Sequence, residues 1–125
     1  MSSLLPDPEP VYLDVDLAMS QIGDVQAMQG MLTMLEESLA RDIPAIADLL
    51  DSGDIVGANR LLHPLKGFIP IFCGPVLSEL VAQVEMLSKD ASSTTVGPAY
   101  AQLMPELNQL LADVSFYLND KGAAT

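Results

Sequence analysis

The feature that most constrains the fold of this chain is a long apolar stripe in its first half. Between positions 25 and 46, apolar residues recur at steps of three or four, namely Val25, Met28, Leu32, Leu35, Leu39, Ile43 and Ile46. Because successive residues turn by about 100° around a helix axis, this spacing puts all seven on one side of an α-helix. We therefore predict a long amphipathic helix, capped by Asp24 and bent at Pro44, whose apolar side must be covered by other helices.

Four further helices are predicted from the same spacing and from the turn residues between them. They are a short helix from Tyr12 to Ile22, a third helix from about Ile55 to Ile69, a fourth opened by Pro75 with Leu77, Leu80, Val84 and Leu87 on its apolar side, and a last helix opened by Pro98. Asp14 or Asp16 is expected to cap the short helix, and Pro70 to close the third. Short connections imply antiparallel neighbours, so the predicted fold is all-α: an antiparallel up-and-down four-helix bundle with a short additional N-terminal helix.

The length and the ends of the chain define its expected domain organisation. With 125 residues there is room for one core, so we divide the chain into a flexible acidic leader (1–10), the bundle (11–120) and a tail (121–125). No basic and apolar signal segment opens the sequence, and no apolar run approaches the roughly 20 residues that span a bilayer. The single cysteine, Cys73, allows no internal disulfide. We expect a cytoplasmic monomer.

The charge and the residue types of the chain narrow its partners. Five basic residues against 17 acidic ones give a formal net charge of −12, which repels nucleic-acid backbones and anionic membrane surfaces. One histidine, one cysteine and scattered carboxylates show no metal-ligand spacing, and the sequence has no glycine-rich phosphate loop. We therefore expect no nucleic acid, no membrane, no metal and no bound cofactor.

His63, the only histidine, belongs to the one group of residues with a clear chemical logic. On the predicted third helix it lies roughly a third of a turn from the centre of the apolar stripe, so it should face solvent. A neutral imidazole offers one nitrogen lone pair for attack on phosphorus. Lys66, three residues on, can neutralise phosphoryl oxygens, and Gly67, four residues on, leaves space for a partner's active site to close over the ring.

The segment His63-Pro64-Leu65-Lys66-Gly67 resembles the motif of histidine-phosphotransfer domains, in which Lys and Gly follow an exposed bundle histidine at the third and fourth positions. The resemblance covers about residues 12–90 and includes further short segments: Leu13-Asp14, Ile22-Gly23-Asp24, Leu39 to Leu50, Gly53-Asp54 and Leu77 to Glu85. The chain departs from the family at Pro64, Phe68 and Pro70. We expect the two prolines to kink the helix around the motif.

The resemblance implies a phosphorelay intermediate. His63 would accept a phosphoryl group from an aspartate of a receiver domain and pass it to an aspartate of a response regulator. The implied partners are the receiver domains of response regulators and of hybrid sensor kinases, and Mg²⁺ is expected on the receiver. The chain would then be a phosphoryl carrier without an ATP site, and not an enzyme in its own right.

Glu85 is the fourth candidate site residue, after His63, Lys66 and Gly67. Members of the family often place a hydrogen-bonding residue on the next helix, within reach of the histidine. If the chain turns near Gly74, His63 and Glu85 each lie 11 residues from the turn, and an antiparallel hairpin sets them at one level. A carboxylate there can accept the proton of Nδ1 and leave Nε2 free. The alternative for Glu85 is a surface charge without this role.

Two other functions stay open on the sequence alone. In the first, the bundle is a phosphorylation-independent adaptor that binds or blocks a receiver domain or a kinase through Phe68, Ile69 and neighbouring apolar residues. In the second, it is a structural helical module, such as an oligomerisation bundle, without phosphate chemistry. A His63 buried and hydrogen-bonded in the core would favour this second alternative.

Overall fold

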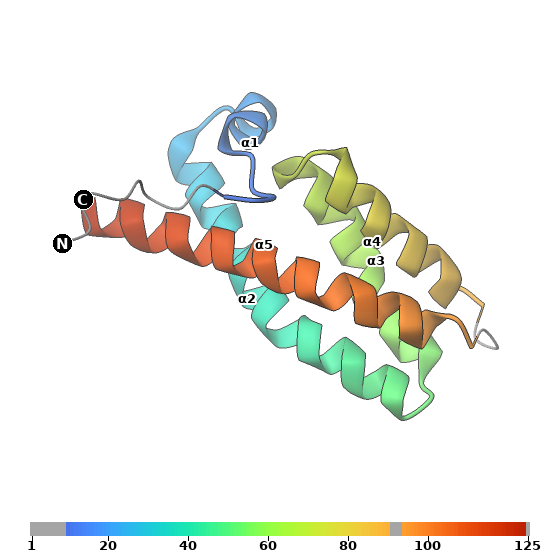
Figure 1. Cartoon of the computed structure of the whole chain (residues 1–125). Helices are drawn as coiled ribbons and strands as arrows, with labels where there is room; N and C mark the ends of the chain where they lie inside the picture. Colours follow the sequence, from blue (N-terminus) through green and yellow to red (C-terminus); the bar gives the residue numbers. More distant parts are fainter. Residues whose placement is uncertain (1–9, 91–93, 125) are drawn as a thin grey trace.

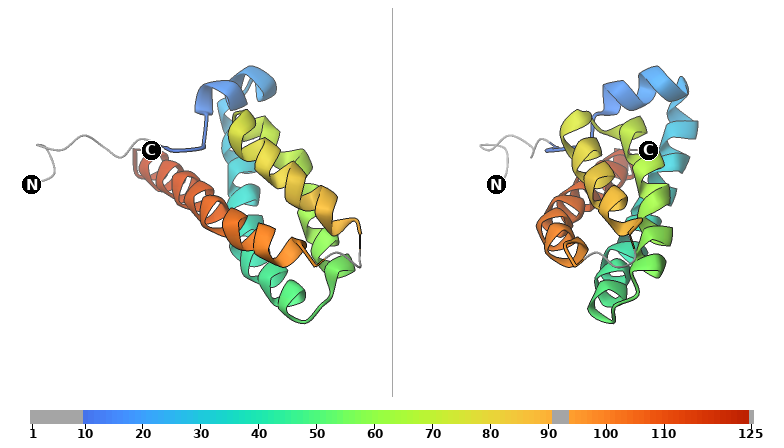
Figure 2. Two further views of the ribbon diagram at one scale, coloured as in Figure 1. Left: turned by 45° about the vertical axis from the view of Figure 1, so that its right-hand side comes forward. Right: turned by 90° about the vertical axis from the view of Figure 1, so that its right-hand side faces the viewer.

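In its described part the chain folds into five α-helices, and four of them form a bundle (Figure 1). The computed structural model describes residues 10–90 and 94–124, the last four by their backbone alone. The helices are α1 (Val15–Ile22), α2 (Val25–Asp51), α3 (Ile55–Phe72), α4 (Pro75–Ser88) and α5 (Val96–Ala124). Helices α2 to α5 run alternately up and down, each packs on the next, and α5 returns to contact α2 (Figure 2). The predicted all-α bundle with a short N-terminal helix is thereby confirmed.

Aspartates open three of the helices. The side chains of Asp14, Asp24 and Asp54 accept hydrogen bonds from the backbone N–H groups at the third position after each of them, at 2.9, 2.7 and 2.8 Å. Each bond satisfies an N–H group that has no partner within its helix. Helix α1 therefore starts after Asp14, so both the expected start at Tyr12 and the alternative cap Asp16 were wrong. Gly23 ends α1 in the left-handed conformation, with a φ of 82°, and the predicted last residue, Ile22, is confirmed.

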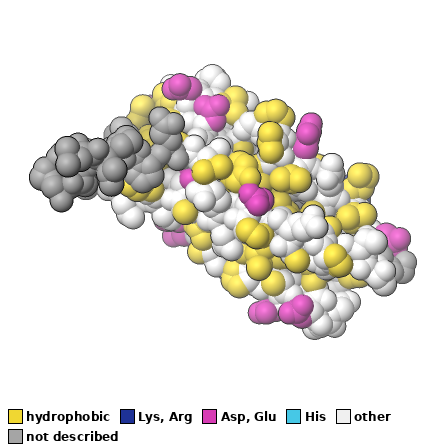
Figure 3. All heavy atoms as spheres, viewed as in Figure 1, with side chains coloured by type: hydrophobic (Ala, Val, Ile, Leu, Met, Phe, Trp, Pro, Cys, Tyr) yellow, Lys and Arg dark blue, Asp and Glu magenta, His cyan; other side chains and the backbone are white. Residues whose placement is uncertain are grey.

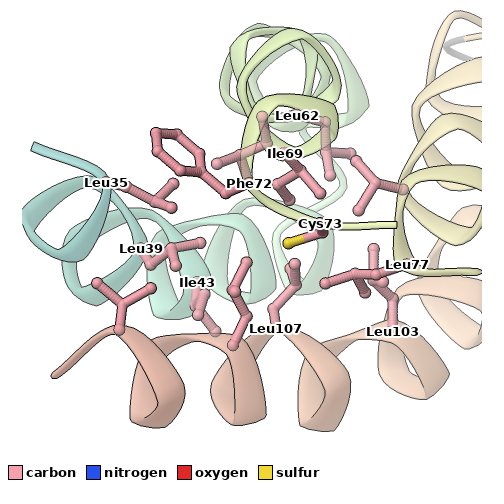
Figure 4. Packing of buried hydrophobic residues seen from close by; sticks show 14 of the residues in the cluster. Leu35, Leu39, Ile43, Leu62, Ile69, Phe72, Cys73, Leu77, Leu103 and Leu107 are labelled. Atoms are coloured by element: carbon pink, nitrogen blue, oxygen red, sulfur yellow. The ribbon is translucent and has the colours of Figure 1, made fainter. Parts of the chain in front are cut away.

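The core lies between the four bundle helices, and the side chains in Figure 4 come from all of them. The long predicted stripe is buried apart from Val25, which lies in the first turn of α2 and is 50% exposed. On α4 the predicted stripe was partly wrong, because Leu80 is 36% exposed and Val81 is fully buried in its place. Neighbouring positions on a helix point about 100° apart, so the face of α4 that packs into the core is rotated from the predicted one.

Prolines interrupt the helices less than predicted. Helix α3 continues through Pro70 to Phe72, so the expected end at Ile69 was wrong. A proline removes its own N–H donor, but the residues after it can keep theirs, and the fully buried Phe72 holds the last turn in the core. Helix α5 begins at Val96, before Pro98, and its backbone stays helical to Ala124 through most of the expected tail.

The segment before α1 is tied across the bundle to α5. Oδ2 of Asp113 accepts hydrogen bonds from the backbone N–H groups of residues 11–13 at 2.9, 2.7 and 3.2 Å, and Gln109 donates to Oδ1 at 2.9 Å. Leu13 also forms an isolated antiparallel bridge with Cys73, which is buried. The expected flexible leader lies outside the described residues, apart from Pro10. None of the helices in the described part has the length and apolarity needed to cross a bilayer.

Candidate functional site

His63 lies in the middle of α3 with its ring in solvent. Its side chain is 69% exposed, whereas Leu62 and Leu65 on either side of it are buried in the core. The predicted exposure of His63 is confirmed, and a buried structural histidine is excluded. Because its neighbours anchor the helix, the ring is presented from a fixed backbone and not from a loop.

Glu85 lies directly behind the imidazole, on the neighbouring helix α4. Its side chain is completely buried, and its Oε2 is 3.1 Å from Nδ1 of His63. The α3–α4 hairpin therefore has the register that the positions of His63 and Glu85 around Gly74 predicted. The alternative of Glu85 as a surface charge was wrong.

Glu85 also belongs to a network of polar side chains that the sequence did not reveal. The Nδ2 group of Asn59 donates to Oε2 of Glu85 at 3.1 Å and to Oγ of Ser88 at 2.8 Å. The hydroxyl of Ser88 donates to the backbone carbonyl of Glu85 at 2.7 Å. Asn59 precedes His63 by one helical turn, and this position was the only sequence signal that it belongs to the site. The network fixes the orientation of the carboxylate.

Two lysines share the other oxygen of Glu85. The ammonium group of Lys66 is 3.3 Å from Oε1, and that of Lys89, one turn after Glu85 at the end of α4, is 3.7 Å from it. From the sequence we expected Lys66 to lie beside the phosphoryl-accepting nitrogen of His63. In the structure the ammonium group of Lys66 contacts Glu85 instead. Lys89 was not predicted as a site residue.

The electrostatics of Glu85 determine which ring nitrogen of His63 carries the proton. Burial raises the pKa of the Glu85 carboxyl, but hydrogen bonds from His63, Asn59 and Lys66, with the charge of Lys66, outweigh burial and leave the pKa below its usual range. An ionised carboxylate can only accept, so Nδ1 of His63 must donate. In the neutral ring Nε2 then keeps its lone pair.

Gly67 lies one turn after His63, where the helix surface is open. A Cβ atom built at Gly67 would have no neighbour within 4 Å, so nothing in the described structure requires a glycine there. Ile69, proposed for an adaptor surface, is fully buried, and that part of the prediction was wrong. Phe68 is partly exposed and packs against the core.

The basic residues of the chain concentrate near His63. Three of the five lie on α3 or at the end of α4, namely Arg60, Lys66 and Lys89. The view over α5 in Figure 3 has the opposite character, since hydrophobic and acidic side chains are visible there and no Lys, Arg or His is. In the part of the chain that the structure describes, no group of three or more His, Cys, Asp or Glu side chains is arranged to hold a metal ion.

The site is therefore an exposed imidazole whose Nδ1 is bound by a buried, ionised carboxylate, with basic side chains and an open helix surface around it. Comparisons with protein-family models, with curated proteins and with solved structures gave no match for this chain.

Proposed function

We propose that this protein is a phosphorelay intermediate that accepts a phosphoryl group on Nε2 of His63 from a receiver-domain aspartate and passes it to an aspartate of a response regulator. The observation that carries the proposal is the hydrogen bond between Nδ1 of His63 and the buried Glu85 carboxylate. This bond leaves Nε2 as the nucleophilic nitrogen, on a ring that is mostly in solvent.

The proposed transfer needs no proton movement within the site. The Nε2 lone pair attacks phosphorus, the N–P bond forms, and the P–O bond to the aspartate breaks, with the electron pair leaving on the carboxylate. The ring becomes positively charged while Nδ1 keeps its proton. Glu85 faces that proton and stabilises the developing charge. In the second step a carboxylate oxygen of the next receiver attacks phosphorus and returns the electron pair to Nε2.

Two surface properties support docking of another protein over His63. A glycine inside a helix lowers stability by roughly 0.5–1 kcal/mol relative to alanine. The space around Gly67 is open, so packing within the bundle does not explain why a glycine is present there. A partner that closes over the ring does explain it. The cluster of Arg60, Lys66 and Lys89 on a chain of net charge −12 also matches an acidic partner surface and disfavours a basic one.

Receiver domains are expected to supply Mg²⁺ and most of the charge stabilisation for the phosphoryl group. The chain itself would contribute the positioned imidazole and the docking surface, and would act as a carrier in the cytoplasm.

The adaptor alternative keeps one supporting observation. Met86, next to Glu85 on α4, is 62% exposed, and Val56 on α3 is 50% exposed, so the surfaces of both helices carry apolar side chains that a partner could cover. Such a partner could be bound and blocked without phosphoryl transfer.

Transfer from receiver domains whose aspartate carries labelled phosphate separates these functions. We expect the label to appear on this chain as acid-labile phosphohistidine, and to be absent from His63→Gln at unchanged helix content. Since His63 is the only histidine, any phosphohistidine in the chain reports on it. Full labelling of His63→Gln would refute phosphoryl transfer to His63. Inhibition of receivers by His63→Ala as strong as by the wild type would favour the adaptor.

A further inference from the structure

The Glu85 carboxylate has more positive partners than a single negative charge requires. Oε1 is shared by the ammonium groups of Lys66 at 3.3 Å and Lys89 at 3.7 Å, while Oε2 accepts from His63 and Asn59. A buried carboxylate needs a compensating charge, and one ammonium group supplies it. The second lysine is therefore surplus while His63 is unmodified.

The backbones of the two lysines are held by different helices. Lys66 lies one turn after His63 on the same helix, so its flexible side chain can reach the space around the ring. Lys89 lies one turn after Glu85, directly after the last residue of α4, so its backbone is fixed beside the carboxylate and not beside the ring. Their side chains are 40% and 56% exposed, so neither is locked in place by packing.

Phosphorylation would change the demand for positive charge. A phosphoryl group carries roughly two negative charges near neutral pH, and on Nε2 it would sit across the ring from Glu85. Lys66 alone could not serve both anions. With Lys89 present, Lys66 can leave Glu85 without exposing the buried carboxylate to an uncompensated charge.

The geometry points to a division of labour in which Lys66 moves from Glu85 to the phosphoryl group while Lys89 stays and neutralises Glu85. Lys89 is then a positioning residue that acts through Glu85 and Lys66, and it does not touch the transferred group. This inference rests on the proposed function, because it presupposes a phosphoryl group on His63.

The test uses phosphoramidate, a small phosphoryl donor whose P–N bond breaks with release of ammonia, so no partner protein is needed. The chain has three lysines, Lys66, Lys89 and Lys121, and their side-chain NMR signals can be assigned with single Lys→Met variants. On phosphorylation of the wild type we expect the Lys66 signal to shift and the Lys89 signal to stay. In Lys89→Met the shift of the Lys66 signal on phosphorylation should be lost, because Lys66 must then stay on Glu85 to neutralise its charge.

A double-mutant cycle on the phosphorylation rate adds a second readout. We expect Lys66→Met and Lys89→Met each to slow phosphorylation on the order of threefold, the scale of a partly exposed ion pair. In the Lys66→Met background, Lys89→Met should have no further effect. Arg41→Met is the control, since it removes an exposed charge on α2 that pairs with Asp42 and lies outside both the Glu85 partners and the basic cluster near His63. It should leave the Lys66 shift intact.

The possible failures are distinguishable. Absence of phosphohistidine in the wild type would overturn the proposed function, and this inference with it. Phosphorylation accompanied by equal shifts of Lys66 and Lys89, or by additive effects of the two variants, would overturn the division of labour alone. Circular dichroism of each variant establishes that the bundle is folded.

Discussion

Replacement of Glu85 by leucine should slow phosphorylation of His63 without unfolding the bundle. The variant removes a fully buried carboxylate from behind the ring and fills its place with an apolar side chain of similar size. Removing one partner of a buried ion pair is costly when the other charge stays buried, and the lysines that face Glu85 are 40% and 56% exposed. Asn59 keeps its bond to Ser88 at 2.8 Å, and both lysines can turn to water. We expect the free energy of unfolding to change by less than about 1 kcal/mol.

The effect on reactivity follows from the lost bond to Nδ1. A hydrogen bond to a charged group contributes about 1.5–3 kcal/mol, and the lower end applies because the ring of His63 is 69% exposed. A loss of about 1.5 kcal/mol corresponds to roughly a tenfold lower rate. In Glu85→Gln a neutral acceptor remains, with about half the strength, so we expect a loss of roughly three- to fourfold.

The assay is single-turnover phosphorylation of His63 by phosphoramidate, combined with urea unfolding of the same variants. An order of rates in which wild type exceeds Glu85→Gln and Glu85→Gln exceeds Glu85→Leu, at nearly constant stability, supports the reasoning. Wild-type rates in Glu85→Leu would refute it. A loss of several kcal/mol of stability in that variant would show that Glu85 mainly holds α3 and α4 together.

Gly67→Ala should raise the free energy of unfolding by roughly 0.5–1 kcal/mol and slow transfer from a receiver. Gly30→Ala, at an equally open helical site on α2, should stabilise the bundle similarly and leave transfer unchanged. Equal transfer rates in the two variants would remove Gly67 from the docking surface. Leu62→Ala, at a fully buried position beside the histidine, should cost about 2–5 kcal/mol by urea unfolding. Because folding lowers the pKa of Glu85, the ionised carboxylate stabilises the fold above about pH 4.5, and this contribution is lost as the pH falls through the folded-state pKa. The wild type should therefore lose more stability on acidification than Glu85→Gln. Parallel plots of unfolding free energy against pH would contradict this. Asp113→Asn should cost about 1 kcal/mol and increase hydrogen exchange of the amides at residues 11–13, and unchanged exchange would argue against the tie to α5.

Strong local signals made most of the fold predictable. The apolar spacing of α2 extends over many turns, and Asp24 and Gly23 mark the boundary before it with bonds that the structure contains. The errors lie where the signal is short or depends on another helix. The exposure of Leu80 follows from the rotation of α4 against its neighbours, which the sequence of α4 alone does not specify.

The candidate site was predictable in part for the same physical reason. The exposure of His63 depends on its own helix, and its level relative to Glu85 depends on the length of one hairpin, so both could be derived from spacing. Asn59 and Lys89 join the site through contacts with Glu85 across and along α4. Such contacts depend on the rotation and tilt of two helices, and polar residues at these positions carry no pattern of their own.

The most direct test of the account is to determine which atom of His63 carries phosphorus after transfer from a phosphorylated receiver domain. With ¹⁵N-labelled histidine, the chain gives signals from the two ring nitrogens of a single residue, so the assignment is unambiguous. We predict phosphorus on Nε2 and a proton on Nδ1, hydrogen-bonded to Glu85. Phosphorus on Nδ1, or no phosphohistidine at all, would contradict the account.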